Sequence, residues 1–200
     1  MSRIKIGSIV LVLAFVVATP AFGQQSRKMV GFSVGATSGD LQGGLVNTDA
    51  RWGFTGGVFG AVRTSRNSVV GIEVNYVQKG GKDLARLDYI EIPFLVGALA
   101  ENDKVKFNFY TGIGLAFKVG CSLDEQEPIA VPLGVSADCD DANSTEWAWP
   151  IGIGLAVRNA NGGLIGLDTR YSVGLSDTFK GSAVRNRSWQ FRLYYGVPMG

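Results

Sequence analysis

The sequence predicts an all-β protein, an eight-stranded antiparallel up-and-down transmembrane β-barrel. Three observations predict it: eight segments in which apolar side chains alternate with small or polar ones, connections that alternate between short and long, and an unusual composition. Of the 200 residues 28 are glycine, and only 18% are charged, against about 25% in typical domains. No segment has a sustained helical period.

The N-terminus has the features of a secretory signal peptide. Two basic residues start it, residues 9–18 are an unbroken apolar stretch, and small residues precede a cleavage site after Gly23. A membrane-spanning helix needs about 20 apolar residues, so an uncleaved anchor is disfavoured. We expect residues 1–23 to be removed on export, leaving residues 24–200 as a single barrel domain with equal numbers of basic and acidic residues. That balance argues against nucleic acid as a partner.

The first four alternating segments cover residues 29–37, 51–62, 68–79 and 87–99. In each of them β-branched or aromatic side chains take every second position, and mostly glycine or polar residues stand between them. In order, their apolar faces carry Val30, Phe32, Val34 and Ala36; Trp52, Phe54, Val58 and Val62; Val70, Ile72, Val74 and Tyr76; and Ile90, Ile92, Phe94 and Val96. A period of two indicates strands with two different faces.

The last four segments cover residues 104–119, 147–157, 164–173 and 188–197, and they repeat the pattern. In order, their apolar faces carry Val105, Phe107, Phe109, Ile113, Leu115 and Phe117; Trp147, Trp149, Ile151, Ile153 and Leu155; Ile165, Leu167, Tyr171 and Val173; and Trp189, Phe191, Leu193, Tyr195 and Val197. Glycine, serine, asparagine and a few ions fill much of the opposite faces. We therefore expect eight strands.

The connections between these segments alternate in length. Short polar turns are predicted at residues 63–67, 100–103 and 158–163, and the other connections cover residues 38–50, 80–86, 120–146 and 174–187. Short turns at one end and longer loops at the other are typical of outer-membrane barrels, whose short turns face the periplasm. An even number of strands returns both termini to that side. Closure also removes sheet edges, which lipid does not tolerate.

Alternation alone does not say which face is outside, because a soluble lipocalin-like barrel alternates as well. The polar face here is too poor in charge for a solvent-exposed surface, whereas the apolar face is rich in aromatic residues. Aromatic residues also stand near the long-loop ends of several strands and form a predicted interfacial girdle: Trp52, Tyr76, Trp147, Trp149, Tyr171 and Trp189. These features favour lipid outside. A soluble carrier of an apolar ligand would need the opposite arrangement.

The polar face predicts a network of ion pairs inside the barrel. Its members are Glu73, Glu91, Asp168, Arg170 and Arg192, with Lys79 and Lys118 near strand ends. Side chains nearly fill an eight-stranded barrel, and unpaired buried charges cost several kcal/mol. We expect the two arginines to contact the two glutamates. Such a network would either plug the lumen or gate a narrow path for small ions or protons.

The connection 120–146 contains both cysteines of the chain. In an exported protein Cys121 and Cys139 are expected to form a disulfide, which stabilises a loop of this size by about 3 kcal/mol in the chain-entropy model. The connection is acidic, and it is the first place to look for an extracellular ligand. Three aspartates, Asp138, Asp140 and Asp141, are a weak candidate for a divalent cation, because their spacing does not match an EF-hand.

Catalysis finds little support in the sequence. Histidine is absent, so a Ser–His pair cannot be built. Two Gly-x-Gly sequences, at residues 112–114 and 152–154, lack the third glycine of a dinucleotide loop and lie within predicted strands. We expect neither catalytic residues nor a cofactor.

Three segments carry a family resemblance. Residues 89–95 (YIEIPFL), 110–114 (YTGIG) and 167–172 (LDTRYS) resemble strands of the small porin-like outer-membrane β-barrel family of the PorT-like kind. The resemblance implies an outer-membrane location and insertion by the outer-membrane assembly machinery. Such barrels often end in an aromatic residue, whereas this chain ends Val-Pro-Met-Gly, so Tyr195 would serve that role or the signal is atypical. Some members of the family assist protein secretion.

Together these features predict a small outer-membrane barrel of the Gram-negative envelope, with the lipid bilayer as its main partner. Its expected role is structural, or surface interaction through its extracellular loops, with a filled polar lumen. Two alternatives stay open. One is a narrow porin-like channel for small solutes or ions, and the other is a soluble lipocalin-like carrier.

Overall fold

The computed structural model describes residues 28–44, 46–102, 104–123, 139–160 and 162–199. Nine strands form one antiparallel sheet in these residues: β1 Lys28–Gly43, β2 Val46–Asn47, β3 Arg51–Arg63, β4 Ser68–Gly81, β5 Ala85–Glu101, β6 Val105–Leu123, β7 Thr145–Arg158, β8 Leu164–Gly174 and β9 Arg185–Met199. The described residues include no helix long and apolar enough to cross a membrane. The predicted signal peptide, residues 1–23, lies outside the described residues.

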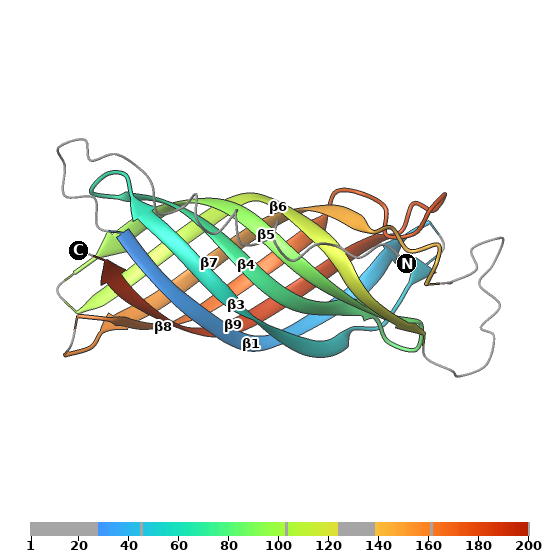
Figure 1. Cartoon of the computed structure of the whole chain (residues 1–200), viewed down its shortest axis with the longest axis horizontal. Coiled ribbons are helices and arrows are strands. Elements are labelled where there is room, and N and C mark those ends of the chain that lie inside the picture. Colours follow the sequence, from blue (N-terminus) through green and yellow to red (C-terminus); the bar gives the residue numbers. More distant parts are fainter. Residues whose placement is uncertain (1–27, 45, 103, 124–138, 161, 200) are drawn as a thin grey trace, which may run out of the picture.

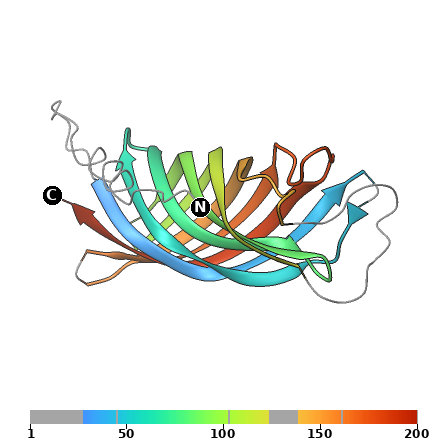
Figure 2. The same cartoon turned by 45° about the vertical axis from the view of Figure 1, so that its right-hand side comes forward.

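The sheet closes on itself into a barrel of eight long strands. Each long strand pairs with the next along the chain, and β1 pairs with β9 from Lys28↔Met199 to Gln42↔Arg185. The short β2 only extends the end of β1 as a hairpin. Figure 1 shows the strands crossing the barrel obliquely, and Figure 2 shows β1 (blue) beside β9 (red). The predicted fold class is confirmed.

The two ends of the barrel differ, as expected from the connection lengths. The turns after β3, β5 and β7 are short, and the start of β1 and the end of β9 lie beside them. We call this end of the barrel the short-turn end. The connections after β1, β6 and β8 lie at the opposite, long-loop end. The connection after β4 is a tight turn, because pairing of β4 with β5 continues to Gly81↔Ala85.

Apolar side chains cover the outside of the barrel, and small or polar ones fill the inside. Phe32 is 55% exposed and Leu167 66%, whereas Thr55 and Gln190 are fully buried. The exposed apolar face fits a lipid environment. The alternative of a soluble carrier, which needs the aromatic face inside, is therefore wrong.

Several strands run further than predicted at the long-loop end. Strand β1 reaches Gly43 rather than residue 37, and β6 reaches Leu123 rather than residue 119. In the extension of β1 the outward side chains are polar, as at Asp40 and Gln42, while the inward Leu41 is apolar. Beyond the apolar band, polar side chains therefore face outward and apolar ones inward. A search for apolar outward faces consequently places the end of the strand too early.

Candidate functional site

The centre of the lumen contains a set of paired charges that we call the charged belt: Glu73, Tyr110, Asp168, Arg170 and Arg192. Asp168 and Arg192 are register partners on β8 and β9. Arg192 donates to Asp168 Oδ1 from Nη2 at 2.6 Å and from Nε at 2.8 Å. Its third nitrogen, Nη1, lies 2.8 Å from Glu73 Oε2. Arg170 Nη2 lies 2.8 Å from the other oxygen of Glu73.

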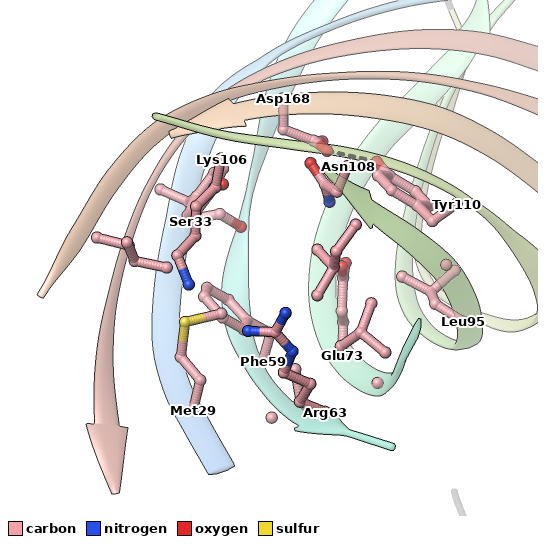
Figure 3. Close-up of a pocket in the computed structure, with 18 of the residues that line it drawn as sticks. Met29, Ser33, Phe59, Arg63, Glu73, Leu95, Lys106, Asn108, Tyr110 and Asp168 are labelled. Atoms are coloured by element: carbon pink, nitrogen blue, oxygen red, sulfur yellow. Dashed lines mark hydrogen bonds between the residues drawn. The ribbon is translucent and has the colours of Figure 1, made fainter. Parts of the chain in front are cut away.

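Tyr110 of β6 connects the two halves of the charged belt. Its hydroxyl donates to Asp168 Oδ2 at 2.5 Å (Figure 3) and accepts from Arg170 Nε at 3.2 Å. The ring needs space that only glycine leaves on β7, because a Cβ at Gly152 would lie 2.3 Å from the tyrosine. Two carboxylates and two guanidinium groups thus compensate each other, with Asp168, Arg170 and Arg192 all buried. Nothing in the sequence beyond the inward position of Tyr110 indicates that it belongs to this set.

Glu91 differs from the expectation that it contacts an arginine. Its ion-pair partner is Lys79 on β4, and both side chains are buried. Gln190 Nε2 also reaches Glu91 Oε2, at 3.5 Å. Pro93 of β5 lies at the level of Glu73, and Glu91 is the next inward residue toward the long-loop end. The predicted single network therefore divides into two.

A third polar group lies deeper toward the long-loop end. Glu146 accepts a 2.5 Å hydrogen bond from the hydroxyl of Tyr89 and is held by Asn186 Nδ2, 3.0 Å from both carboxylate oxygens. All three side chains are buried. Glu146 was expected to belong to the acidic connection 120–146, but it is the second residue of β7 and points inward. The buried, hydrogen-bonded carboxylate of Glu146 therefore helps to fill the lumen and is not part of the loop surface.

Above these polar groups, apolar side chains close the long-loop end. We call this cluster the hydrophobic cap: Leu41, Leu87, Tyr89, Ala116, Ala142, Phe179 and Val184. Its loop members come from the connections after β6 and β8, which hydrogen-bond to each other through Asn143 N and Thr178 O at 2.8 Å. Phe179 is 2% exposed. Sequence periodicity missed the cap because loops carry no period.

The disulfide ties one of these loops to the barrel wall. Cys121 of β6 is bonded to Cys139, as predicted, with the two Cα atoms 5.7 Å apart. Cys121 packs against the hydrophobic cap. Lys118 strengthens the attachment, since its Nζ donates to the carbonyl oxygens of Cys139 at 2.7 Å and Ala142 at 2.6 Å. Lys118 therefore anchors a loop and does not join the charged belt.

The weak metal candidate receives no support from the described residues, among which no group of three or more potential ligands comes together. Asp138 lies outside them. Asp140 and Asp141 instead offer their backbone oxygens to Lys180, the first to its Nζ at 2.9 Å and the second to its amide at 2.8 Å.

The six residues of the predicted girdle stand in the long-loop halves of their strands. The four tryptophans are exposed on the outer face, between 46% and 67%. Tyr171 packs against Trp189 with ring centroids 4.8 Å apart. Trp149 Nε1 donates to Thr111 Oγ1 at 2.9 Å, which satisfies its polar atom within the apolar surface. Tyr76 is half-buried and accepts from Gln78 Nε2 at 3.1 Å.

A closed barrel of eight long strands with an apolar outer face and a polar, filled interior is a membrane barrel of the outer-membrane class. The comparison with protein families agrees. The chain belongs to the family described as outer membrane protein beta-barrel domain, whose model matches residues 22–180. The protein is therefore an outer-membrane protein.

Solved structures of small outer-membrane barrels have the same fold. Neisserial surface protein A (NspA) is similar with a TM-score of 0.58 and 14% identity, covering 86% of this chain and 97% of its own. OprG from Pseudomonas aeruginosa has a TM-score of 0.51 and 12% identity, covering 88% and 98%. A weaker similarity, with a TM-score of 0.46 and 15% identity, relates the chain to the outer membrane enzyme PagL, covering 84% and 99%. No curated protein matches the chain at the level of sequence.

Proposed function

We propose that this protein is a closed outer-membrane barrel that acts at the cell surface through its extracellular loops. The observation that carries the proposal is the double obstruction of the lumen. The charged belt fills its centre, and the hydrophobic cap fills its long-loop end. A solute crossing the barrel would have to separate both.

The described parts of two long loops, in contrast, are attached to the barrel and to each other. The disulfide and Lys118 hold the described end of the connection after β6, at Cys139 and Ala142, and backbone hydrogen bonds join that end to the connection after β8. Binding residues concentrate on loops held by rigid scaffolds. Between its cysteines, the first of these loops carries the acids Asp124, Glu125, Glu127 and Asp138, so a partner with a basic surface is the complementary one.

The proposal includes the finer parts of the assignment. The YIEIPFL segment of β5 supports kinship with PorT-like barrels, and the missing histidine supports a non-enzymatic role. We also propose that the outer-membrane assembly machinery inserts the chain. In this proposal the assembly machinery recognises Tyr195 of β9, which packs on Phe32 with ring centroids 5.9 Å apart.

Binding of a basic probe tests the loop proposal. Vesicles carrying the oxidised, folded barrel should bind a fluorescent octalysine saturably, and binding should weaken as salt rises because the attraction is electrostatic. A variant with the four acids changed to their amides, checked for folding by its heat-dependent electrophoretic mobility, should lose this binding. The proposal would be contradicted if the amide variant bound octalysine as well as the native protein does, or if the native protein bound octaglutamate as well as octalysine.

A further inference from the structure

The short-turn half of the lumen contains a cavity that the proposed role of the loops does not use. Its volume is about 190 Å³, and its floor is formed by residues of the charged belt. We call it the vestibule. Its other lining residues lie toward the short-turn ends of their strands, so its mouth faces the periplasm in the orientation that outer-membrane barrels adopt.

The walls of the vestibule are mainly apolar. They are formed by Phe59, Ala61, Val69, Leu95, Leu99 and Leu164. A cavity of about 150 Å³ with such walls is large enough for benzene. The vestibule therefore has room for one benzene-sized apolar group.

The floor offers that group no free charge. Glu73 and Asp168 bind Arg170 and Arg192, and the hydroxyl of Tyr110 is bonded to Asp168. Two acids balance two bases there. A ligand that entered the vestibule with a charge would keep that charge at the mouth.

The mouth is strongly positive. Arg63 and Lys106 line it and share Glu101, with their nitrogens 2.5 and 2.8 Å from its two oxygens. In Figure 3, Arg63 and Lys106 gather with Phe59 on one side of the cavity, away from Tyr110. Lys28 and Arg158 also line the cavity, and neither has an ion-pair partner in the described part of the chain. Their charges are therefore available to an anion.

We propose that the vestibule binds a small organic monoanion with a benzene-sized apolar body. The body fills the space between Phe59 and Leu95, and the anionic group lies at the mouth against Lys28 and Arg158. Apolar walls supply affinity, and the cationic mouth selects the anion over a neutral analogue. The ligand enters from the periplasm, since the closed wall and the charged belt bar the other directions.

The test uses ligand-observed fluorine NMR on the full barrel in lipid nanodiscs, with empty nanodiscs as reference. We expect 4-fluorophenylacetate to bind saturably and at least fivefold more tightly than 4-fluorobenzyl alcohol, which has the same ring and no charge. Binding no greater than in empty nanodiscs, or equal affinity for the two compounds, would overturn the proposal.

Three variants locate the site. Lys28→Gln with Arg158→Gln should weaken binding of the anion at least fivefold and leave the alcohol unchanged. Ala61→Phe should abolish binding of both, because the new ring fills the cavity. Arg66→Gln, which removes an exposed cation of the same end that does not line the cavity, should change nothing.

The charge variants keep the test decisive if Ala61→Phe fails to fold. Folding is checked by the change in electrophoretic mobility on heating. An anion affinity that falls as far in Arg66→Gln as in the double variant would show a general effect of surface charge and would overturn the site.

Discussion

Arg192 and Asp168 face each other across β8 and β9 and are joined by two hydrogen bonds, of 2.6 and 2.8 Å. The same guanidinium group also reaches Glu73 on β4, on the other side of the lumen. One side chain thus joins strands that are not neighbours in the sheet. Arg192 thus bonds to three other members of the charged belt, Asp168, Glu73 and Tyr110.

Removing Arg192 should destabilise the barrel strongly. Arg192→Ala leaves Asp168 and Glu73 short of a positive charge in a poorly hydrated interior, and loss of one partner of a buried pair costs about 3–5 kcal/mol. The free energy of unfolding, measured by urea titration in lipid vesicles, reports the loss. Arg66→Ala removes an exposed arginine and should cost less than about 0.5 kcal/mol. Equal effects of the two changes would contradict a buried network.

Lys79 and Glu91 should behave as an independent pair. Lys79→Met and Glu91→Gln each leave one partner uncompensated, so the double variant should be more stable than the sum of the single effects by about 1–3 kcal/mol. The same cycle between Lys79 and Arg192 should be additive within about 0.5 kcal/mol. Energetic coupling between Lys79 and Arg192 would contradict this independence and would support the single network expected from the sequence.

The disulfide should stabilise the folded barrel measurably. Replacing Cys121 and Cys139 together by alanine frees a loop with a sequence separation of 18, which corresponds to about 3 kcal/mol in the chain-entropy model. Reduction of the native protein should lower the free energy of unfolding by the same amount, which appears as a lower urea midpoint. No shift on reduction would mean that hydrogen bonds of Lys118 to the loop carry the attachment alone.

The hydrophobic cap should depend on Phe179. Phe179→Ala removes a ring that is 2% exposed and should cost about 3–5 kcal/mol, because a large-to-small change in a core leaves a cavity. Leu175→Ala lies in the same loop, but its side chain is 46% exposed, and a cost below about 0.5 kcal/mol is expected. Urea midpoints of the two variants give the comparison. A Phe179→Ala protein as stable as Leu175→Ala would show that the loop does not close the barrel.

Local periodicity was enough to predict the fold and most inward charges. Asp168 and Arg192 lie on the polar faces of their strands. Because successive residues of a strand alternate between its two faces, both can be placed inside without knowing which strands are adjacent. The partner of Glu91 was not predictable in this way. Whether Glu91 pairs with Lys79 or with an arginine depends on the register between strands and on their tilt in the barrel. The alternation of side chains along one strand determines neither.

The long-loop end was harder for a different reason. Beyond the apolar band the outward side chains become polar, so Glu146 and Leu41 were assigned to loops although they are inward residues of strands. Phe179 and Ala142 belong to loops with no repeating pattern. Their role in the cap depends on three-dimensional contacts alone.

The most direct test of the account is the conductance of the pure, folded protein in planar lipid bilayers. A barrel closed by the charged belt and the hydrophobic cap should give no current steps above the lipid background, while an open porin added to the same bilayers does. Folding is verified beforehand by heat-dependent electrophoretic mobility. Reproducible discrete steps from the native protein would contradict the closed lumen and would favour the narrow channel.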